Sequence, residues 1–346
     1  ESVAPSGGVM MSESTARLVD HLVTLGEPEQ VRIKGFDEPV GARRLLAIRP
    51  RNALSGRTET KLVGRRLEMA TLGALLDRAN DGRGGVVSVI GPPGIGKSRV
   101  AREAAVLAGD RGMSVHWAFC EAHSRDVVFG VVARLLRSLT DVDGGDDAVA
   151  RAHVRGLLPD ADAQDLLLLD GLLGIADPDG PSPQIDPDAW RRRIAALIST
   201  LLLTEDEPAL FVVEDVHWID VGSESLLAEL LTAIRRTRAT MLITARPEYD
   251  GALRYLPGSQ TIVLAPLVDS DVTALLEELL GADRSVADLT AVIADRSVGN
   301  PFFAEEIVRE LAQRDVLTGQ RGNYVCRAEV DELRVPATVQ ATIEAR

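Results

Sequence analysis

The spacing of hydrophobic positions divides the chain into three parts. Up to residue 50, short apolar stretches (GGVMMS, VRIKGF and ARRLLAI) flank one segment of helical spacing, STARLVDHLV. Between residues 61 and 265, runs that are apolar at consecutive positions alternate with segments of helical spacing. Beyond Pro266 the spacing is helical until one last short strand. Runs without alternation are typical of strands buried on both faces, so the middle part predicts an α/β fold with a parallel sheet covered by helices.

The middle part is expected to contribute five strands with helices between them. The strands are predicted over residues 86–90, 114–120, 209–214, 240–244 and 260–264. The clearest helices are predicted over residues 67–79, 98–107 and 189–203, with shorter helical segments between 127 and 173. An acidic loop, DVDGGDD, interrupts these shorter segments, and the loop ADPDGPSPQIDPD follows them.

The same pattern predicts where the domains begin and end. Residues 51–60, RNALSGRTET, have no periodicity and are predicted to be a linker between a front piece, residues 1–50, and the core, residues 61–265. Residues 266–318 are predicted to form a helical subdomain, because three amphipathic helices follow one another there. Residues 319–346 contain a short strand and the start of a further helical unit.

Composition restricts the class of protein. The chain has 346 residues, a formal net charge of -14 and only 3% aromatic residues, which predicts an acidic, soluble protein and argues against nucleic acid as its partner. The longest apolar runs are interrupted by Asp within a few residues, so we expect no membrane span and no signal peptide, and a cytoplasmic location. Cys120 and Cys326 are far apart in sequence, which favours free thiols over a disulfide. Because the sequence starts without Met and stops within a helical pattern, we expect a longer polypeptide.

A phosphate-binding loop follows the first strand of the core. The segment GPPGIGKSRV matches the pattern G-x-x-x-x-G-K-[ST] between a predicted strand and a predicted helix. The glycines let the backbone turn its amides toward phosphates, while the lysine adds positive charge and the serine hydroxyl binds Mg²⁺ at a helix N-terminus. The residues expected to contact the nucleotide are Gly91, Pro92, Pro93, Gly94, Ile95, Gly96, Lys97, Ser98 and Arg99.

A pair of acidic residues ends the third strand of the core, in the segment FVVEDVHWID. Glu214 and Asp215 are predicted at the carboxyl edge of the sheet, where open parallel sheets bind ligands. One of them should reach Mg²⁺ and the other should polarise the attacking water, and the sequence leaves open which does which.

The residues that follow the acidic pair have several interpretations. His217 could be a metal ligand, but no second His or Cys stands at ligand spacing, which favours a packing role near the start of a helix. Trp218 is interpreted as a packing residue, and Asp220 as the cap of a helix that begins near Ser223.

Five motifs together resemble a known family. VGRRLE, GPPGIGKS, LFVVEDVHWID, MLITARPE and GNPFFAEEI occur in the order shown by STAND proteins, the signal transduction ATPases with numerous domains. The chain looks most like the bacterial members that carry a nucleotide cyclase or a DNA-binding domain. The resemblance covers about residues 62–346 and implies a P-loop core, then a helical lid, then a winged helix that begins within residues 319–346. Its acidic pair is Glu-Asp where other branches have Asp-Asp.

The resemblance also implies roles for residues outside the phosphate loop. Val63, Gly64 and Arg65 would lie near the adenine and ribose. Thr244 and Arg246, at the tip of the fourth strand, would sense the γ-phosphate, and Glu214 with Asp215 would form the Walker B pair. Pro301 would press on the nucleotide from the lid, although a proline also commonly starts a helix.

The front piece resembles a second family. GGVMMSESTARLV followed by VRIKGFDEPVGARRLLAI looks like the closing segment of a class III nucleotide cyclase domain. That family's metal-binding aspartates lie in earlier parts of its domain, so we expect no cyclase activity from this chain alone.

Three functions follow from these expectations. The first is an ATP-binding switch that depends on Mg²⁺, hydrolyses ATP slowly and works with upstream cyclase-like and downstream effector domains of the same polypeptide, with self-association on ATP binding. The second is a scaffold that holds ATP or ADP without hydrolysis, and the third is the regulatory part of a cyclase. Nucleic acid is not an expected partner, because the net charge is negative and Arg191–Arg193 are interpreted as a solvated helix face. A membrane is not an expected partner either.

Overall fold

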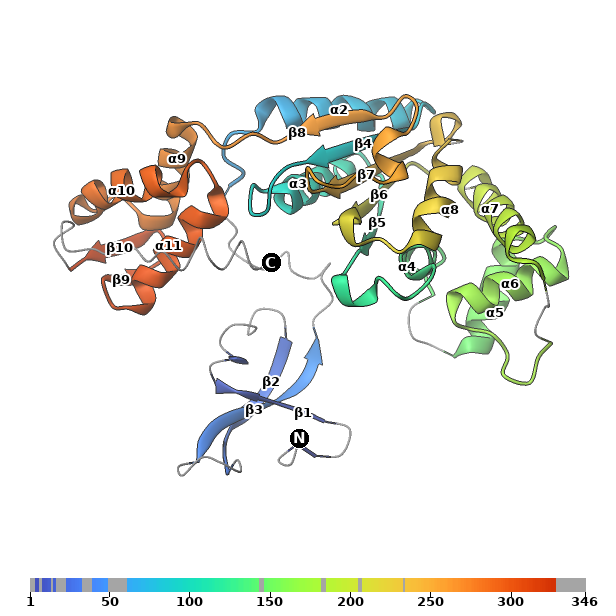
Figure 1. Ribbon diagram of the computed structural model, residues 1–346, viewed down its shortest axis with the longest axis horizontal. Coiled ribbons are helices and arrows are strands. Elements are labelled where there is room, and N and C mark those ends of the chain that lie inside the picture. Colours follow the sequence, from blue (N-terminus) through green and yellow to red (C-terminus); the bar gives the residue numbers. More distant parts are fainter. Residues whose placement is uncertain are drawn as a thin grey trace. The chain divides into compact units, whose positions relative to one another are not determined.

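The computed structural model describes residues 4–5, 8–13, 15–16, 23–32, 39–48, 61–142, 146–181, 185–204, 207–232 and 234–327. The chain divides into two compact units, Glu1–Lys61 and Leu62–Arg346 (Figure 1). Each unit is described below by itself.

The first unit contains an antiparallel sheet of the order β1-β3-β2. Its strands are β1 (Val9–Ser12), β2 (Val23–Val31) and β3 (Val40–Ile48). The second strand was expected over residues 31–36; β2 covers Val31, which pairs with Val40, and residues 33–36 lie outside the described residues. The segment GEPEQ within β2 is polar and mostly exposed, so hydrophobic spacing does not mark it as a strand. Most of the helical segment expected over residues 14–23 lies outside the described residues, and Val23 itself belongs to β2.

The second unit is built on a five-stranded parallel sheet of the order β5-β6-β7-β4-β8 (Figure 1). All five strands lie where the sequence predicted them, which confirms the α/β fold. They are β4 (Gly85–Ile90), β5 (Ser114–Phe119), β6 (Ala209–Glu214), β7 (Ala239–Ala245) and β8 (Gln260–Val263).

Helices cover both faces of this sheet. On one face α2 (Arg66–Asn80) and α3 (Lys97–Gly109) pack on the strands, and on the other α4 (Gly130–Leu139) and α8 (Val221–Leu231) do so. In β6, Leu210 and Val212 face α2 and α3, whereas Phe211 and Val213 face the opposite layer. Consecutive apolar residues are therefore all buried, as side-chain alternation along a strand requires.

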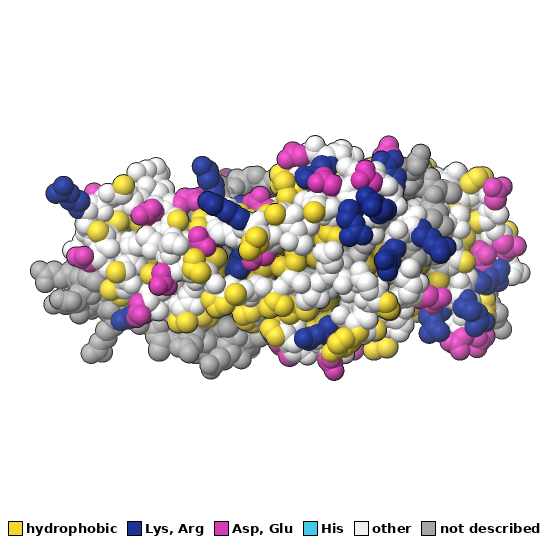
Figure 2. Space-filling model, turned by 90° about the horizontal axis from the view of Figure 1, so that it is seen from above, with side chains coloured by type: hydrophobic (Ala, Val, Ile, Leu, Met, Phe, Trp, Pro, Cys, Tyr) yellow, Lys and Arg dark blue, Asp and Glu magenta, His cyan; other side chains and the backbone are white. Residues whose placement is uncertain are grey.

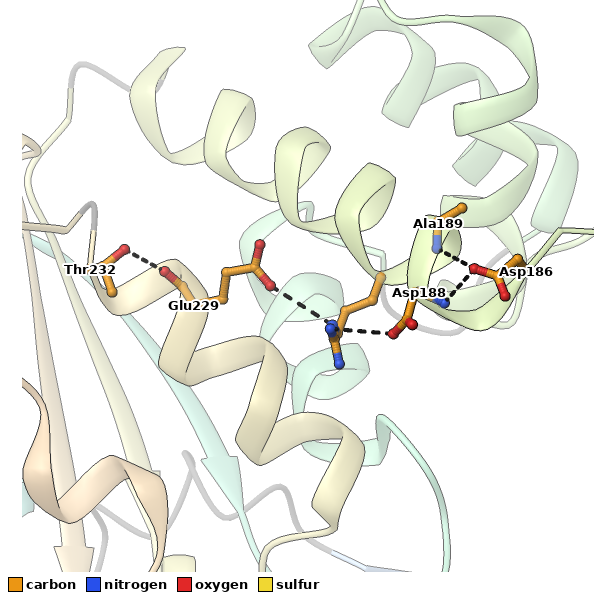
Figure 3. A network of polar contacts seen from close by, with 6 residues as sticks. Asp186, Asp188, Ala189, Glu229 and Thr232 are labelled. Carbon is orange, nitrogen blue, oxygen red and sulfur yellow. Dashed lines mark hydrogen bonds and ion pairs between the residues drawn. The ribbon is translucent and has the colours of Figure 1, made fainter.

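Three further helices that follow α4 and precede β6 extend the second of these layers. They are α5 (Asp147–Leu157), α6 (Ala163–Leu173) and α7 (Pro187–Thr204). An ion pair links α7 to α8, since Arg191 Nε lies 3.9 Å from Glu229 Oε2. Figure 3 shows the surroundings of this pair, where Asp186 Oδ2 accepts hydrogen bonds of 3.1 Å from the amides of Asp188 and Ala189 and so caps the first turn of α7.

The helical subdomain follows the sheet. Its helices are α9 (Asp269–Leu280), α10 (Ala287–Ser297) and α11 (Pro301–Gln313), close to the ranges predicted from their amphipathic spacing. A hairpin of β9 (Leu317–Gln320) and β10 (Asn323–Cys326) packs on these helices. The sequence predicted β10 but not β9, which is short and half polar. The rest of the expected winged-helix unit, residues 328–346, lies outside the described residues.

The described residues also contain single turns of 3₁₀ helix. They are η2 (Ala122–Ser124), η3 (Val216–Trp218), η4 (Ile234–Arg236), η5 (Ala252–Tyr255) and η6 (Arg284–Val286). Cys120 and Cys326 form no disulfide, as expected, and burial raises the pKa of the Cys120 thiol. Within the described ranges, no helix has both the length and the apolar character needed to cross a membrane.

The surface over α2 and β8 is mixed in charge. Figure 2 shows Lys and Arg side chains in small separate groups on this face, with Asp, Glu and hydrophobic side chains between them. On the helices between β5 and β6, the guanidinium groups of Arg191 and Arg193 pair with carboxylates of the chain itself, including Asp188 and Asp162.

Candidate functional site

The phosphate-loop motif forms the turn between β4 and α3, at the carboxyl edge of the sheet. Gly94 and Gly96 have φ angles of 77° and 102°, which side chains other than glycine rarely adopt. An added Cβ at Gly94 would also lie only 2.8 Å from the Cβ of Phe302. Gly96 leads into α3 in a left-handed conformation, and no side chain among the described residues caps that helix. The first amides of a helix have no partner within the helix, and such a helix start can bind an anion.

Lys97 is folded back onto the loop that precedes it. Its side chain is buried, and Nζ donates hydrogen bonds of 2.9 Å to the carbonyl of Gly91 and 3.1 Å to that of Pro92. Burial lowers the pKa of the Lys97 ammonium, and the nearby Asp215 carboxylate is the largest influence that opposes this shift. Ser98, the expected Mg²⁺ ligand, is the second residue of α3.

The acidic pair lies at the tip of β6. Glu214 is the last residue of that strand and is 4% exposed, while Asp215 is half-buried and has a left-handed backbone with φ of 59°. The amide of Asp215 donates a 2.9 Å hydrogen bond to Oγ1 of Thr244 on the neighbouring strand β7. Thr244 is fully buried and holds the backbone of Asp215 in this turn.

Arg246 follows β7 and lies against the segment after the acidic pair. Its guanidinium carbon is 5.9 Å from the ring centroid of Trp218, and Nη1 is 3.9 Å from Oε1 of Glu248. Trp218 also packs on the hydrophobic core, which confirms its role as a packing residue. In addition, its ring makes a cation–π contact with Arg246.

His217 lies between Asp215 and Trp218. Its Nδ1 is 3.9 Å from Oδ1 of Asp215, and its ring centroid is 5.2 Å from that of Trp218. Burial lowers the pKa of the His217 imidazole, whereas the Asp215 carboxylate opposes that shift. No group of three or more His, Cys, Asp and Glu residues that could hold a metal occurs in the part of the chain that the structure describes.

Asp220 caps α8, as the sequence predicted. Its Oδ1 accepts a hydrogen bond of 2.8 Å from the amide of Ser223 and a second, also of 2.8 Å, from the amide of Phe129. The second bond ties the loop before α4 to the start of α8.

The start of α11 lies directly on the phosphate loop. Asn300 Nδ2 donates a 3.1 Å hydrogen bond to the carbonyl of Pro93, and the amide of Phe302 donates a 3.4 Å bond to the carbonyl of Gly94. Pro301 is the first residue of α11, and its Cγ is 3.9 Å from the position of a Cβ on Gly96. Sequence reasoning singled out Pro301 but missed Asn300, although an Asn before a helix-starting proline is a recognisable cap signal.

The segment Val63–Arg65 joins the same assembly. Val63 packs on the core of the helical subdomain, and a Cβ on Gly64 would lie 2.6 Å from Oδ2 of Asp271 at the start of α9. Arg65 Nη2 donates a 3.2 Å hydrogen bond to the carbonyl of Ile95 in the phosphate loop. This segment, the loop and the helical subdomain are therefore in mutual contact.

Comparison with known families agrees with this geometry. A family model described as an AAA ATPase domain matches residues 61–243, more than half of the 346 residues. The chain belongs to the AAA ATPase domain family. Members of this family bind nucleotide, usually with Mg²⁺, and often oligomerise. A second model, described as a domain of unknown function (DUF8739), matches residues 269–324, which span α9 to the start of β10.

Individual relatives of this AAA ATPase domain are distant. An uncharacterized protein from Rhizobium meliloti (strain 1021) is 28% identical over 323 residues, which are 90% of this chain and 31% of that protein. A STAND protein with a tetratricopeptide repeat sensor from Pyrococcus horikoshii is 17% identical, with a TM-score of 0.40 over 71% of this chain and 30% of that chain. The Orc1 protein of Aeropyrum pernix, solved in complex with DNA, is 18% identical, with a TM-score of 0.44 over 84% of this chain and 67% of that chain.

The residues at the carboxyl edge of the sheet have the chemistry that Mg²⁺ and a nucleotide require. Mg²⁺ is usually held by one or two side-chain oxygens together with phosphate oxygens and water. Ser98 carries a hydroxyl and Glu214 and Asp215 carry carboxylates that would suit Mg²⁺, and Lys97 carries a buried ammonium whose charge would suit phosphates.

Proposed function

We propose that this AAA ATPase domain is the ATP-binding switch of a larger regulator and that it hydrolyses ATP slowly. The observation that carries the proposal is the contact between the helical lid and the phosphate loop, through Asn300 to Pro93 and Phe302 to Gly94. Phosphates bound in the loop would act on the same backbone that the lid holds. The nucleotide state could then shift the position of the lid.

The roles of the side chains follow from their places at the sheet edge. Lys97 would leave the carbonyls of its own loop and contact the β- and γ-phosphates. Mg²⁺, held by Ser98 and one of Glu214 and Asp215, would neutralise phosphate charge. The other acidic residue would orient the attacking water.

The remaining residues would couple the state of the nucleotide to the position of the helical subdomain. Arg246 would sense the γ-phosphate, with Thr244 keeping the neighbouring acidic turn in place. Pro301 would contact the nucleotide from the lid, and Val63–Arg65 would lie beside the base and ribose. Two contacts support these roles. Pro301 lies next to Gly96 of the phosphate loop, and Arg65 donates a hydrogen bond to the carbonyl of Ile95 in that loop.

Binding of Mg-ATP tests this proposal directly. The Lys97→Ala variant should lose binding of both ATP and ADP, measured by isothermal titration calorimetry, because the loop loses its buried cation. The matched control is Lys61→Ala, which removes an exposed lysine at the boundary of the two compact units. Unchanged nucleotide binding in Lys97→Ala would refute a nucleotide function for this loop.

A scaffold that holds nucleotide without hydrolysis is the second candidate. The closed contact between lid and loop favours it, because a nucleotide could simply stabilise this arrangement. Asp215→Asn and Glu214→Gln distinguish the two functions. A switch would accumulate bound ATP and change its oligomeric state by light scattering, whereas a scaffold would behave like the wild type.

We also propose a place for the module in a longer cytoplasmic polypeptide. The chain spans about a third of the length of the curated relative that it matches, and the first unit resembles the end of a class III cyclase domain. An upstream cyclase-like domain and a downstream effector would then be its partners. The gene product can be searched for paired upstream aspartates, whose absence would speak against a catalytic cyclase.

A further inference from the structure

The imidazole of His217 is buried without hydrogen bonds. The side chain is 9% exposed, and neither Nδ1 nor Nε2 has a hydrogen-bond partner among the described residues. Buried polar groups in folded proteins nearly always have partners, because burial removes the water that would otherwise serve. Two such nitrogens on one ring are unusual and call for an explanation.

Charged groups of the candidate nucleotide site surround this ring. Asp215 Oδ1 lies 3.9 Å from its Nδ1, and the Arg246 guanidinium lies over the ring of Trp218, on which His217 also packs. The carboxylate of Asp215 and the guanidinium of Arg246 also influence the pKa of Lys97 in the phosphate loop. His217 and the phosphate-loop lysine therefore share one electrostatic environment, although they are 120 residues apart in sequence, from 97 to 217.

The position of the ring distinguishes its two nitrogens. Nδ1 is the nitrogen near Asp215, at 3.9 Å from Oδ1, so Nε2 lies on the far side of the ring. A neutral imidazole that donates from Nε2 suits an anionic oxygen and avoids repulsion from Lys97 and Arg246.

We propose that His217 contacts the terminal phosphate of bound ATP, with Nε2–H donating to a γ-phosphate oxygen. This contact makes the site prefer ATP to ADP. The inference rests on the proposed function, because it requires the phosphate loop to hold the nucleotide. It gives His217 a role in ligand contact in place of the packing role expected from sequence.

Three variants test the contact. In His217→Gln the amide nitrogen lies near the former Nε2, in His217→Asn it lies near the former Nδ1, and His217→Leu has no polar atom. Affinities for ADP and for β,γ-imido-ATP are measured by calorimetry with Mg²⁺. We expect the imido analogue to bind about 10- to 100-fold more weakly to the Leu and Asn variants, the range for hydrogen bonds to charged groups. We expect His217→Gln to stay within about 3-fold of the wild type and ADP affinity to change by less than about 2-fold throughout.

The controls separate this inference from the proposed function. The ADP affinity of each variant confirms that it is folded, and the comparison of Gln with Asn remains valid if the Leu variant does not fold. His123→Leu, which removes a 79% exposed histidine, should leave both affinities unchanged. Equal losses for ADP and the imido analogue, or no loss in His217→Leu and His217→Asn, would overturn the role of His217. Wild-type binding by Lys97→Ala would instead overturn the nucleotide function itself.

Discussion

Asn300 makes two hydrogen bonds that can be removed separately. Its Oδ1 accepts a 3.1 Å bond from the amide of Phe302 and so caps α11, while its Nδ2 donates the 3.1 Å bond to the carbonyl of Pro93. The residue is only 9% exposed, so solvent replaces neither bond freely. Asn300→Ala removes both bonds, whereas Asn300→Ser keeps a cap but is too short to reach Pro93.

The expected losses of stability follow from these two bonds. Removing a helix cap costs about 1 kcal/mol. Leaving the Pro93 carbonyl without its donor costs about another 1–2 kcal/mol. Asn300→Ala should therefore lose about 2–3 kcal/mol of unfolding free energy, and Asn300→Ser about 1–2 kcal/mol.

Thermal unfolding of the nucleotide-free protein, followed by circular dichroism, measures both losses. With about 2 °C for each kcal/mol in a domain of this size, Tm should fall by about 4–6 °C in the Ala variant and about 2–4 °C in the Ser variant. Hydrogen exchange at the first turn of α11 should quicken more in the Ala variant than in the Ser variant. If the two variants lose the same stability, or both stay within about 0.5 kcal/mol of the wild type, Asn300 does not hold the helical subdomain to the phosphate loop.

Two further predictions concern buried carboxylates. Asp220→Ala should lose about 2–4 kcal/mol in urea denaturation, because it frees the amides of Ser223 and Phe129 together, and a loss below about 1 kcal/mol would contradict this. Burial raises the pKa of Asp170, although Arg155 Nη2 lies 2.9 Å from its Oδ2 and opposes the shift. The folded protein then binds the Asp170 proton more tightly than the unfolded chain does. Protonated Asp170 therefore stabilises the fold at pH values below its ordinary pKa, and this stabilisation is lost as the pH rises through its raised pKa in the folded protein. Relative to Asp170→Asn, the wild type should therefore lose stability over that rise in pH, as measured by the midpoints of urea denaturation. A constant difference in stability between the two proteins would show that the Asp170 carboxyl does not titrate in that range.

Local patterns in the sequence determined most of the fold. The five strands of the sheet are apolar at consecutive positions because both faces are covered, and this pattern is readable without a structure. The strands β2 and β9 contain many polar residues, and hydrophobic spacing did not predict them as they occur. Their extent is set by pairing with β3 and β10, and pairing is not encoded in hydrophobic spacing.

The sequence by itself also determined the chemistry of the candidate site. A glycine-rich loop with Lys97 and an acidic pair at a second strand tip each occupy a short segment, so spacing alone reveals them. Only the tertiary structure decided what surrounds them. It placed the side chain of Asn300 on a loop 207 residues away and the hydroxyl of Thr244 under Asp215. It also buried the ring of His217 with no hydrogen-bond partner among the described residues. Such contacts depend on how separate elements pack, because distance along the chain gives no information about which polar groups share an interior.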